Sequence, residues 1–229
     1  SSDFGIMAIE NSIAGSIIPN YALIDNLNLN IVGECFVNIN HQLMALPGVD
    51  LNDIETVSSH PMALLQCKKF FKDFPKISLI EARDTAGEAK RISENKIKNI
   101  GAIASVEASK LYELNIIHKN IQTIEKNETR FVIVSKQRMS SSEDFDKASI
   151  KFSLSHKTGS LASVLTILRD YNLNLTKIQS LPIIEIPWKY SFFIDTTFND
   201  MNDFNNAIEL IGHKSESLKL LGIYKNRMK

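Results

Sequence analysis

Cysteine is scarce in this 229-residue chain, and its two copies, Cys35 and Cys67, lie far apart. They form no Cys-x-x-Cys pair and each has apolar neighbours, so we expect buried, reduced thiols. The five histidines are also scattered, without the spacing that a metal site requires: His41, His60, His118, His156 and His213. No strand is followed by Gly-x-Gly-x-x-Gly, and there is no P-loop lysine or Gly-x-Ser-x-Gly elbow. The sequence therefore predicts neither a metal nor a nucleotide cofactor.

The chain also lacks net charge and long apolar runs. Lys and Arg total 26, as do Asp and Glu, and there is no basic run, which argues against nucleic-acid binding. No apolar stretch approaches the roughly 18 residues that span a bilayer, and the N-terminus has no signal-peptide pattern. We expect a cytoplasmic protein without a membrane partner, with one large domain or two smaller ones.

Short strands alternate with helices of about ten residues through the first 137 positions. Strands are expected at 4–9, 29–37, 41–46, 54–57, 77–80, 101–104 and 132–134, and helices from Ile17 and at 63–71, 86–94 and 106–114. Asp84-Thr85 and Ser105 are expected to cap the starts of the last two helices. This alternation is typical of an α/β domain with a mostly parallel sheet.

The pattern changes after a polar stretch without periodicity, which predicts a linker at 138–147. Residues 148–229 then give strands at 148–154, 173–184, 188–197 and 217–224, with helices at 159–171 and 201–211. This βαββαβ order indicates a ferredoxin-like domain. We therefore expect two domains, 1–137 and 148–229.

Three turns between a strand and the following helix carry small polar residues: Glu10-Asn11-Ser12, Ser58-Ser59-His60 and Asp84-Thr85. In open α/β sheets such turns gather at the carboxyl ends of the strands, where helix N-termini favour a small anion. Asn11, Ser59, Thr85 and Gln66 would orient that anion, and Arg130 would clamp a carboxylate. The alternative is that Asn11, Ser59 and Thr85 are only helix caps.

The stretch Asn127-Glu128-Thr129-Arg130-Phe131 leads directly into an apolar strand. Because side chains alternate along a strand, Thr129 and Phe131 share one face, which places a hydroxyl donor beside an aromatic wall. An ordinary strand start would have the same composition.

Several motifs, in order, resemble those of the prephenate dehydratase family: Ile9-Glu10-Asn11-Ser12-Ile13-Ala14-Gly15-Ser16, Ser59-His60-Pro61, Ala63-Leu64, Gln66-Cys67, Asp84-Thr85-Ala86, Ala102-Ile103-Ala104-Ser105 and Asn127 through Phe131. The C-terminal domain resembles the ACT regulatory domain of the same family through Gly159-Ser160-Leu161, Leu165, Asn174-Leu175-Thr176-Lys177-Ile178, Trp188-Lys189-Tyr190 and Leu221-Gly222-Ile223-Tyr224. The resemblance covers essentially the whole chain.

The resemblance implies a two-lobed, periplasmic-binding-protein-like catalytic domain. It also implies that prephenate loses carbon dioxide and water to give phenylpyruvate without a metal or coenzyme, so the enzyme would be a lyase of L-phenylalanine biosynthesis. The family's catalytic domain normally opens with a strand and helix bearing a glycine-rich turn, which the residues before Glu10 do not supply, so we expect the domain to be N-terminally incomplete.

The resemblance assigns help in hydroxide departure to Thr129. Our hypothesis is that Asn11, Ser59 and Gln66 orient the substrate, Arg130 lies near a carboxylate and Phe131 walls the ring. The further substrate-binding candidates are Glu10, Ser12, His60 and Thr85. For His60, which precedes Pro61, a general base and a structural role both remain open.

The effector site that the resemblance implies comprises Gly159, Ser160, Leu161, Gln179, Ser180, Leu181 and Pro182. The family commonly has Glu-Ser-Arg-Pro where this chain has Gln179 to Pro182, and Pro-Gly where it has Thr158-Gly159. Control by L-phenylalanine is therefore open, and so is a C-terminal domain that only dimerises. The resemblance implies a homodimer or homotetramer.

Two other functions remain open from the sequence. An arogenate dehydratase performs the same elimination on the aminated substrate, and nothing in the residues discriminates the two. A non-catalytic sensor of an amino acid or another anion would combine an anion-binding domain with an ACT-like domain.

Overall fold

The computed structural model describes residues 2–137, 144–183 and 186–228. The chain forms two compact units: the first unit contains residues 1–11, 15–37 and 129–229, and the second contains 12–14 and 38–128. This grouping differs from the expected domains, because the first strands of the chain pack with the C-terminal domain. Most of the expected linker, residues 138–143, lies outside the described residues.

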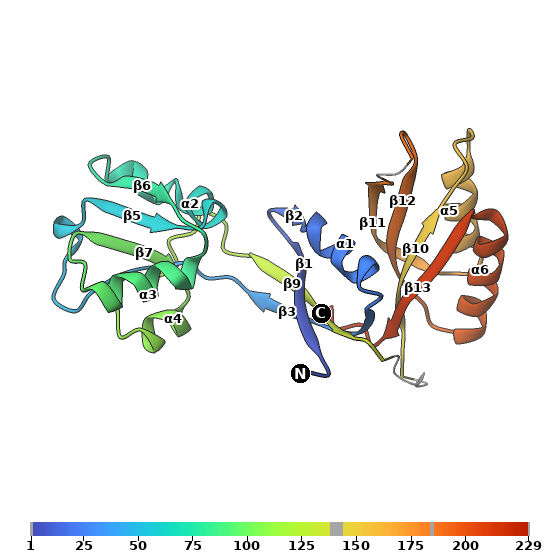
Figure 1. Cartoon of the computed structure of the whole chain (residues 1–229), viewed down its shortest axis with the longest axis horizontal. Helices are drawn as coiled ribbons and strands as arrows, with labels where there is room; N and C mark the ends of the chain where they lie inside the picture. The colour runs from blue at the N-terminus through green and yellow to red at the C-terminus, as the bar shows by residue number, and fades with distance from the viewer. Residues whose placement is uncertain (1, 138–143, 184–185, 229) are drawn as a thin grey trace. The chain divides into compact units, whose positions relative to one another are not determined.

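The second unit is built on a five-stranded sheet of order β6-β5-β7-β4-β8; Figure 1 labels β5, β6 and β7. Its strands are β4 (Gln42–Ala45), β5 (Thr56–Ser59), β6 (Ser78–Glu81), β7 (Ile100–Ala104) and β8 (Asn115–His118). β5 is parallel to β6 and β7, but β4 is antiparallel to β7 and β8. The expected mostly parallel sheet is therefore wrong in part: β4 follows β3 with no crossover helix between them, and the sheet is mixed.

The helices of the second unit are α2 (Pro61–Cys67), α3 (Thr85–Asn95) and α4 (Val106–Leu111), with 3-10 turns at Leu51–Asp53 and Phe70–Asp73. Asp84 caps α3 by accepting from the Gly87 amide, and Ser105 caps α4 by accepting from the Ala108 amide at 3.2 Å. Both caps were predicted, and they satisfy amides that a helix start leaves unpaired. Ala89 and Ile92 of α3 pack into one core with the sheet.

The first unit begins with a sheet of order β2-β1-β9-β3. Its strands are β1 (Gly5–Asn11), β2 (Gly15–Ser16), β3 (Asn30–Asn38) and β9 (Glu128–Ser135), and α1 spans Ile18–Asn26. Asn11 pairs with Gly15, whose φ of +80° suits a glycine at this reversal. The predicted strand-to-helix turn at Glu10-Asn11-Ser12 is therefore wrong: these residues end β1 and begin a hairpin, and α1 starts only afterwards.

The C-terminal domain, which we define as β10 to β13, has the predicted βαββαβ order. Its elements are β10 (Lys147–Ser153), α5 (Ser160–Asp170), β11 (Asn174–Pro182), β12 (Tyr190–Thr197), α6 (Met201–Lys214) and β13 (Ser217–Tyr224). The strands form an antiparallel sheet of order β11-β12-β10-β13, with α5 and α6 packed on one face (Figure 1).

The other face of this sheet packs on the first sheet and α1. Ile9, Tyr21, Ile24, Ile31, Val132 and Val134 share one buried cluster with Phe193, Leu221 and Tyr224. The approach is close at Gly222, where an added Cβ would lie 1.9 Å from the Ile31 carbonyl oxygen. The C-terminal domain and the first sheet thus form one body with a common core.

Two smaller findings bear on the sequence predictions. Across the described ranges, no helix is long and apolar enough to cross a membrane. Cys35 and Cys67 are free thiols, and burial raises the pKa of Cys67 to about 12, so that thiol stays protonated and unreactive at neutral pH.

Gly222→Ala should destabilise the first unit by about 3 kcal/mol, because its methyl group meets backbone that cannot move aside without separating β13 from β3. Gly212→Ala in α6 is the matched control: nothing lies within 4 Å of its Cβ, and the change should stabilise by about 0.5–1 kcal/mol. Urea unfolding measures both. Equal midpoints for the two variants would contradict the close packing of β13 on β3.

Candidate functional site

Asn11 and Thr129 lie side by side on the paired strands β1 and β9. The Asn11 Nδ2 donates to Thr129 Oγ1 at 3.0 Å, and Thr129 is only 8% exposed. Since Oγ1 accepts from Asn11, the hydroxyl hydrogen of Thr129 is directed to a different acceptor. The pair is thus an oriented hydroxyl donor in a largely water-excluded place.

A β-bulge puts these two side chains on the same face. Ala8 is opposite Phe131 and Glu10 is opposite Arg130, so Ile9 is an extra residue in β1. Without the bulge, Glu10 would be opposite Thr129, and Asn11 would point to the other face of the sheet. With it, Asn11, Thr129 and Phe131 share one face, as predicted for Thr129 and Phe131, while Glu10 and Arg130 point to the other.

Gln66 is the centre of a separate cluster in the second unit. Its Oε1 accepts from Asn127 Nδ2 at 2.9 Å and lies 2.8 Å from His41 Nε2. An amide oxygen only accepts, so His41 must carry its proton on Nε2. Burial lowers the pKa of His41, with the Gln66 contact opposing it, which favours a neutral ring. Sequence reasoning gave no role to His41, and nothing local signals its pairing with a residue 25 positions away.

Ser59, His60 and Thr85 are engaged at the ends of strands and starts of helices. The Ser59 hydroxyl is fully buried and donates to the Ile103 carbonyl at 2.7 Å, so it ties β5 to β7 where we expected a donor to the substrate. His60 caps α2, with Nδ1 accepting from the Met62 amide at 3.2 Å, which is the structural role among the two left open. Thr85 is the half-buried first residue of α3, directly after the Asp84 cap.

Glu10 and Ser12 are also held by other parts of the chain. Glu10 Oε1 lies 2.6 Å from Lys177 Nζ on β11. Ser12 Oγ accepts from the Glu128 amide at 3.0 Å, and the Ser12 amide donates to the Glu128 carbonyl at 2.8 Å. Both residues continue or anchor the β1–β9 pairing.

Arg130 is on the opposite face of β9 from its neighbour Thr129 and points into the first unit. Its Nε donates to Glu34 at 2.7 Å, its Nη1 donates to Asp195, and its Nη2 donates to Tyr224 Oη at 2.9 Å. Burial disfavours the cation, but Asp195, Tyr224 and Glu34 outweigh it and hold the pKa of Arg130 above its usual range. Arg130 therefore binds the carboxylates of Glu34 and Asp195, where we expected it to bind a substrate carboxylate.

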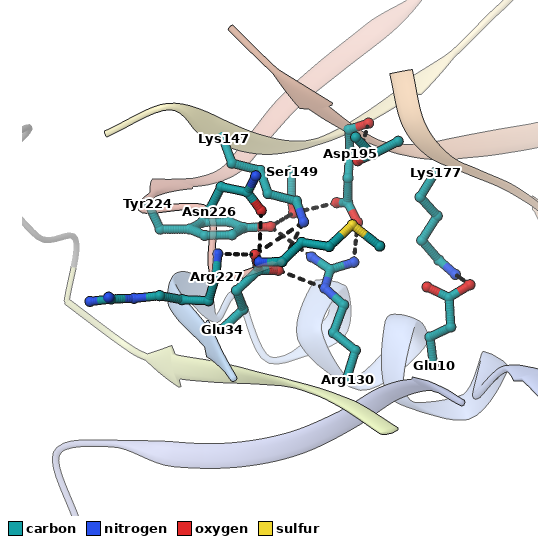
Figure 2. A network of polar contacts seen from close by, with 12 residues as sticks. Glu10, Glu34, Arg130, Lys147, Ser149, Lys177, Asp195, Tyr224, Asn226 and Arg227 are labelled. Atoms are coloured by element: carbon teal, nitrogen blue, oxygen red, sulfur yellow. Dashed lines mark hydrogen bonds and ion pairs between the residues drawn. The ribbon is translucent and has the colours of Figure 1, made fainter. Parts of the chain in front are cut away.

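The partners of Arg130 form a larger buried network (Figure 2). Lys147 Nζ donates to both oxygens of Glu34, at 3.1 and 3.0 Å, and the Ser149 hydroxyl donates to Asp195. Because Ser149 Oγ donates to a carboxylate, it accepts from Tyr224, 2.6 Å away. Burial and the nearby Asp195 raise the pKa of Tyr224, which keeps that hydroxyl protonated. Two cations and two carboxylates balance, as a buried ionic cluster requires.

The C-terminal domain has an open pocket of about 130 Å³ at the start of α5. It is lined by Leu154, Ser155, His156, Lys157, Ser160, Leu161, Trp188, Lys189, Tyr190 and Phe192. Of the expected effector residues, Ser160 and Leu161 line it, and Gly159 caps α5 with a φ of +82°.

The other expected effector residues lie on β11. Gln179 Nε2 donates to the Ser180 carbonyl at 2.9 Å, and Ser180 pairs with Phe192. Pro182 pairs with Tyr190, so two pocket-lining residues of β12 are direct neighbours of this strand. Leu181 instead packs on the core shared with the first sheet.

Among the described residues, no three His, Cys, Asp or Glu side chains come together in a way that would hold a metal ion.

Comparison with known proteins identifies the same family that the sequence motifs resemble. The prephenate dehydratase family description matches residues 1–139. A bifunctional chorismate mutase/prephenate dehydratase of Buchnera aphidicola subsp. Schizaphis graminum is 35% identical, covering 97% of this chain and 58% of the relative. An arogenate dehydratase/prephenate dehydratase 1 of Arabidopsis thaliana chloroplasts is 36% identical, covering 97% and 60%. The chain thus spans about three-fifths of the length of these relatives.

Two solved structures are similar over 98% of this chain, each with a TM-score of 0.87. One is a prephenate dehydratase of Arthrobacter aurescens in complex with L-Phe, 25% identical, of which 75% is covered. The other, GqqA, is described as a novel type of quorum quenching acylase; it is 27% identical, and 82% of it is covered. The fold alone therefore accommodates proteins described by different activities. The match to residues 1–139 covers more than half of the chain, and the chain belongs to the prephenate dehydratase family.

Proposed function

We propose that this chain catalyses the decarboxylating dehydration of prephenate to phenylpyruvate, a step of L-phenylalanine biosynthesis in the cytoplasm. The observation that carries the proposal is the Asn11–Thr129 hydrogen bond of 3.0 Å, which orients a hydroxyl donor in the motif that resembles the family's catalytic one. Family membership supports the reaction class, and the geometry supports Thr129 as the residue that acts.

The reaction needs little from the protein. The bond between the ring and its carboxylate breaks, and the electron pair enters the ring as carbon dioxide leaves. The ring C–O bond breaks at the opposite carbon, and the departing hydroxide takes up a proton to become water. The ring becomes aromatic, which supplies the driving force. The protein must hold the dianion, exclude water and stabilise the leaving oxygen.

Thr129 is suited to the last task. Asn11 occupies a lone pair of its oxygen, so its hydrogen is available to the leaving hydroxyl group. A threonine hydroxyl is a weak acid, so we assign it a hydrogen bond to the leaving oxygen, with the proton delivered through it or from water. Phe131 lies on the same face and is proposed as a wall for the ring.

Gln66 is proposed as a substrate-orienting residue. His41 and Asn127 both hold its Oε1, so the direction of its Nε2 donor is fixed before any ligand arrives. A pre-oriented neutral donor adds specificity at little entropic cost. Arg130 is not assigned to the substrate, because Glu34, Asp195 and Tyr224 occupy its donors.

The C-terminal domain is proposed to be an ACT regulatory domain that binds L-phenylalanine and pairs with a second copy in a dimer or tetramer. The pocket at the start of α5 has apolar walls for a ring and lies beside the N-terminal amides of that helix. A structurally similar relative is described in complex with L-Phe. A homodimer or homotetramer would give about two or four times the 25.8 kDa mass of the chain by light scattering.

The second candidate is arogenate dehydration, favoured by the name of the Arabidopsis relative, which includes both activities. Incubation with prephenate, followed by the alkaline absorbance of phenylpyruvate, tests the proposed function. The same incubation with arogenate, with phenylalanine as the product measured, tests the second. Turnover of neither substrate would leave the sensor alternative.

Thr129→Val should lower kcat by about 100- to 1,000-fold, because it keeps the shape of the side chain and removes the donor to the leaving oxygen. Thr129→Ser, which retains the hydroxyl, should keep much more activity. Thr176→Val is the matched control, since the Thr176 hydroxyl donates to the Asp195 carbonyl within the C-terminal sheet. Near-normal turnover by Thr129→Val would remove Thr129 from the mechanism.

L-phenylalanine should change the fluorescence of Trp188, which is the only tryptophan of the sequence, is 81% exposed and lines the pocket. Binding should shift the emission to the blue, because the bound ring shields the indole from water. Leu161→Lys should weaken the response at least tenfold by placing charge among the apolar lining. D-phenylalanine is the ligand control. If millimolar L-phenylalanine gives no spectral shift and no calorimetric heat, the C-terminal domain only dimerises.

A further inference from the structure

The proposed catalytic pair has two oppositely charged residues, Glu10 and Arg130, as its direct neighbours in the β1–β9 ladder. Asn11 is opposite Thr129, and one step along the ladder Glu10 is opposite Arg130. Consecutive pairs point to opposite faces, so the side chains of Glu10 and Arg130 reach the C-terminal domain directly behind the Asn11–Thr129 hydrogen bond. The backbone that carries Asn11 and Thr129 is therefore set by what Glu10 and Arg130 contact.

Both residues are held by the C-terminal domain, from different strands. Arg130 reaches Asp195 on β12 and Tyr224 on β13. Glu10 reaches Lys177 on β11, at 2.6 Å (Figure 2). Each strand of the proposed catalytic pair thus has its own ionic attachment, adjacent in sequence to the residue that acts.

Lys177 is built into this position rather than resting on the surface. Its side chain is 7% exposed, its Nζ donates to Ser16 Oγ at 2.9 Å, and the same nitrogen lies 5.7 Å from the centre of the Tyr21 ring. Ser16 belongs to β2, which pairs with β1 at Glu10 and Asn11. One ammonium group from β11 therefore fixes the end of β1 and its hairpin together.

The two attachments differ in burial. The Arg130 side chain is surrounded by the core network, whereas the Glu10 side chain is 36% exposed. A buried charge that loses its partner destabilises the fold, but a partly exposed carboxylate is rehydrated by water. The Lys177 ammonium is buried, but it keeps the Ser16 hydroxyl and the Tyr21 ring when Glu10 leaves. The Lys177–Glu10 pair therefore costs less to break than the contacts of Arg130.

We infer that Glu10 and Lys177 are positioning residues, and that their ion pair couples the position of β11 to the Asn11–Thr129 pair. This inference rests on the proposed function in assigning catalysis to Thr129. Arg130 anchors β9 permanently, and Lys177 sets β1 against it. A displacement of β11 then alters the Asn11–Thr129 distance, and with it the rate of the chemical step.

The decisive variants remove the ion pair without changing side-chain length: Lys177→Met, Glu10→Gln and their combination. Lys151→Met is the matched control. It breaks a Lys–Asp pair with Asp25, which also joins the C-terminal sheet to the first part of the chain, but through α1 rather than β1 or β9. A general loosening of the first unit would affect the control and the test variants alike.

Hydrogen–deuterium exchange measures the coupling without any substrate. Amides at the end of β1 and the start of β9 should exchange at least several-fold faster in Lys177→Met and Glu10→Gln than in Lys151→Met, while β7 in the second unit stays unchanged. Unchanged exchange at β1 and β9 in both test variants would overturn the inference. This readout holds even if the protein turns over neither prephenate nor arogenate, an outcome that would defeat the proposed function alone.

Kinetics give the second readout. Each single variant should lower kcat about tenfold or more, with KM within about twofold, because misplacement of a reacting group affects the chemical step more than binding. The double variant should be no slower than the slower single variant, since both changes remove one interaction. A raised KM with unchanged kcat, or a Lys177→Met variant as fast as Lys151→Met, would overturn the positioning role.

Discussion

The buried ionic cluster of Arg130, Glu34, Lys147 and Asp195 is the interaction on which the first unit depends. It contains two cations and two carboxylates, each from a different strand of two sheets. Taking such charges out of water is costly unless every one has a partner, and removal of a single member leaves an unpaired charge that costs about 3–5 kcal/mol. The cluster therefore allows one relative placement of the two sheets, and the apolar residues around it fill in that arrangement.

β9 has two tasks because its residues alternate between two faces. Arg130, Val132 and Val134 belong to the interior shared with the C-terminal domain, and Thr129 and Phe131 belong to the opposite face. The same alternation would point Asn11 away from Thr129 if the bulge at Ile9 did not place the two residues opposite each other. The proposed catalytic residue is thus held on a strand whose other side is tied to the proposed regulatory domain, so rigidity and coupling have one structural origin.

Local patterns predicted most elements correctly. The βαββαβ order, the caps Asp84 and Ser105, and the shared face of Thr129 and Phe131 each follow from neighbours in the sequence. The role of Arg130 could not be predicted in this way, because its partners Glu34 and Asp195 lie 96 and 65 positions away in the sequence. Nothing in the local sequence distinguishes a buried guanidinium from one that binds substrate. The hairpin after Asn11 was missed for a related reason. Gly15 fits both a helix approach and a reversal, and only pairing with β1 decides between them.

Strand β11 joins these observations to regulation. Its residues alternate between the face toward the first sheet, with Lys177 and Leu181, and the face whose neighbours on β12, Phe192 and Tyr190, line the pocket. A ligand shifts an equilibrium only by its difference in affinity between two states, so an effector must bind one position of β11 better than another. Leu181 stands where the resembled family commonly has an arginine, and it gives one position of β11 an additional contact. Its side chain adds apolar contact with the first sheet, and a ligand that displaces β11 acts against that contact as well as against the Lys177–Glu10 pair.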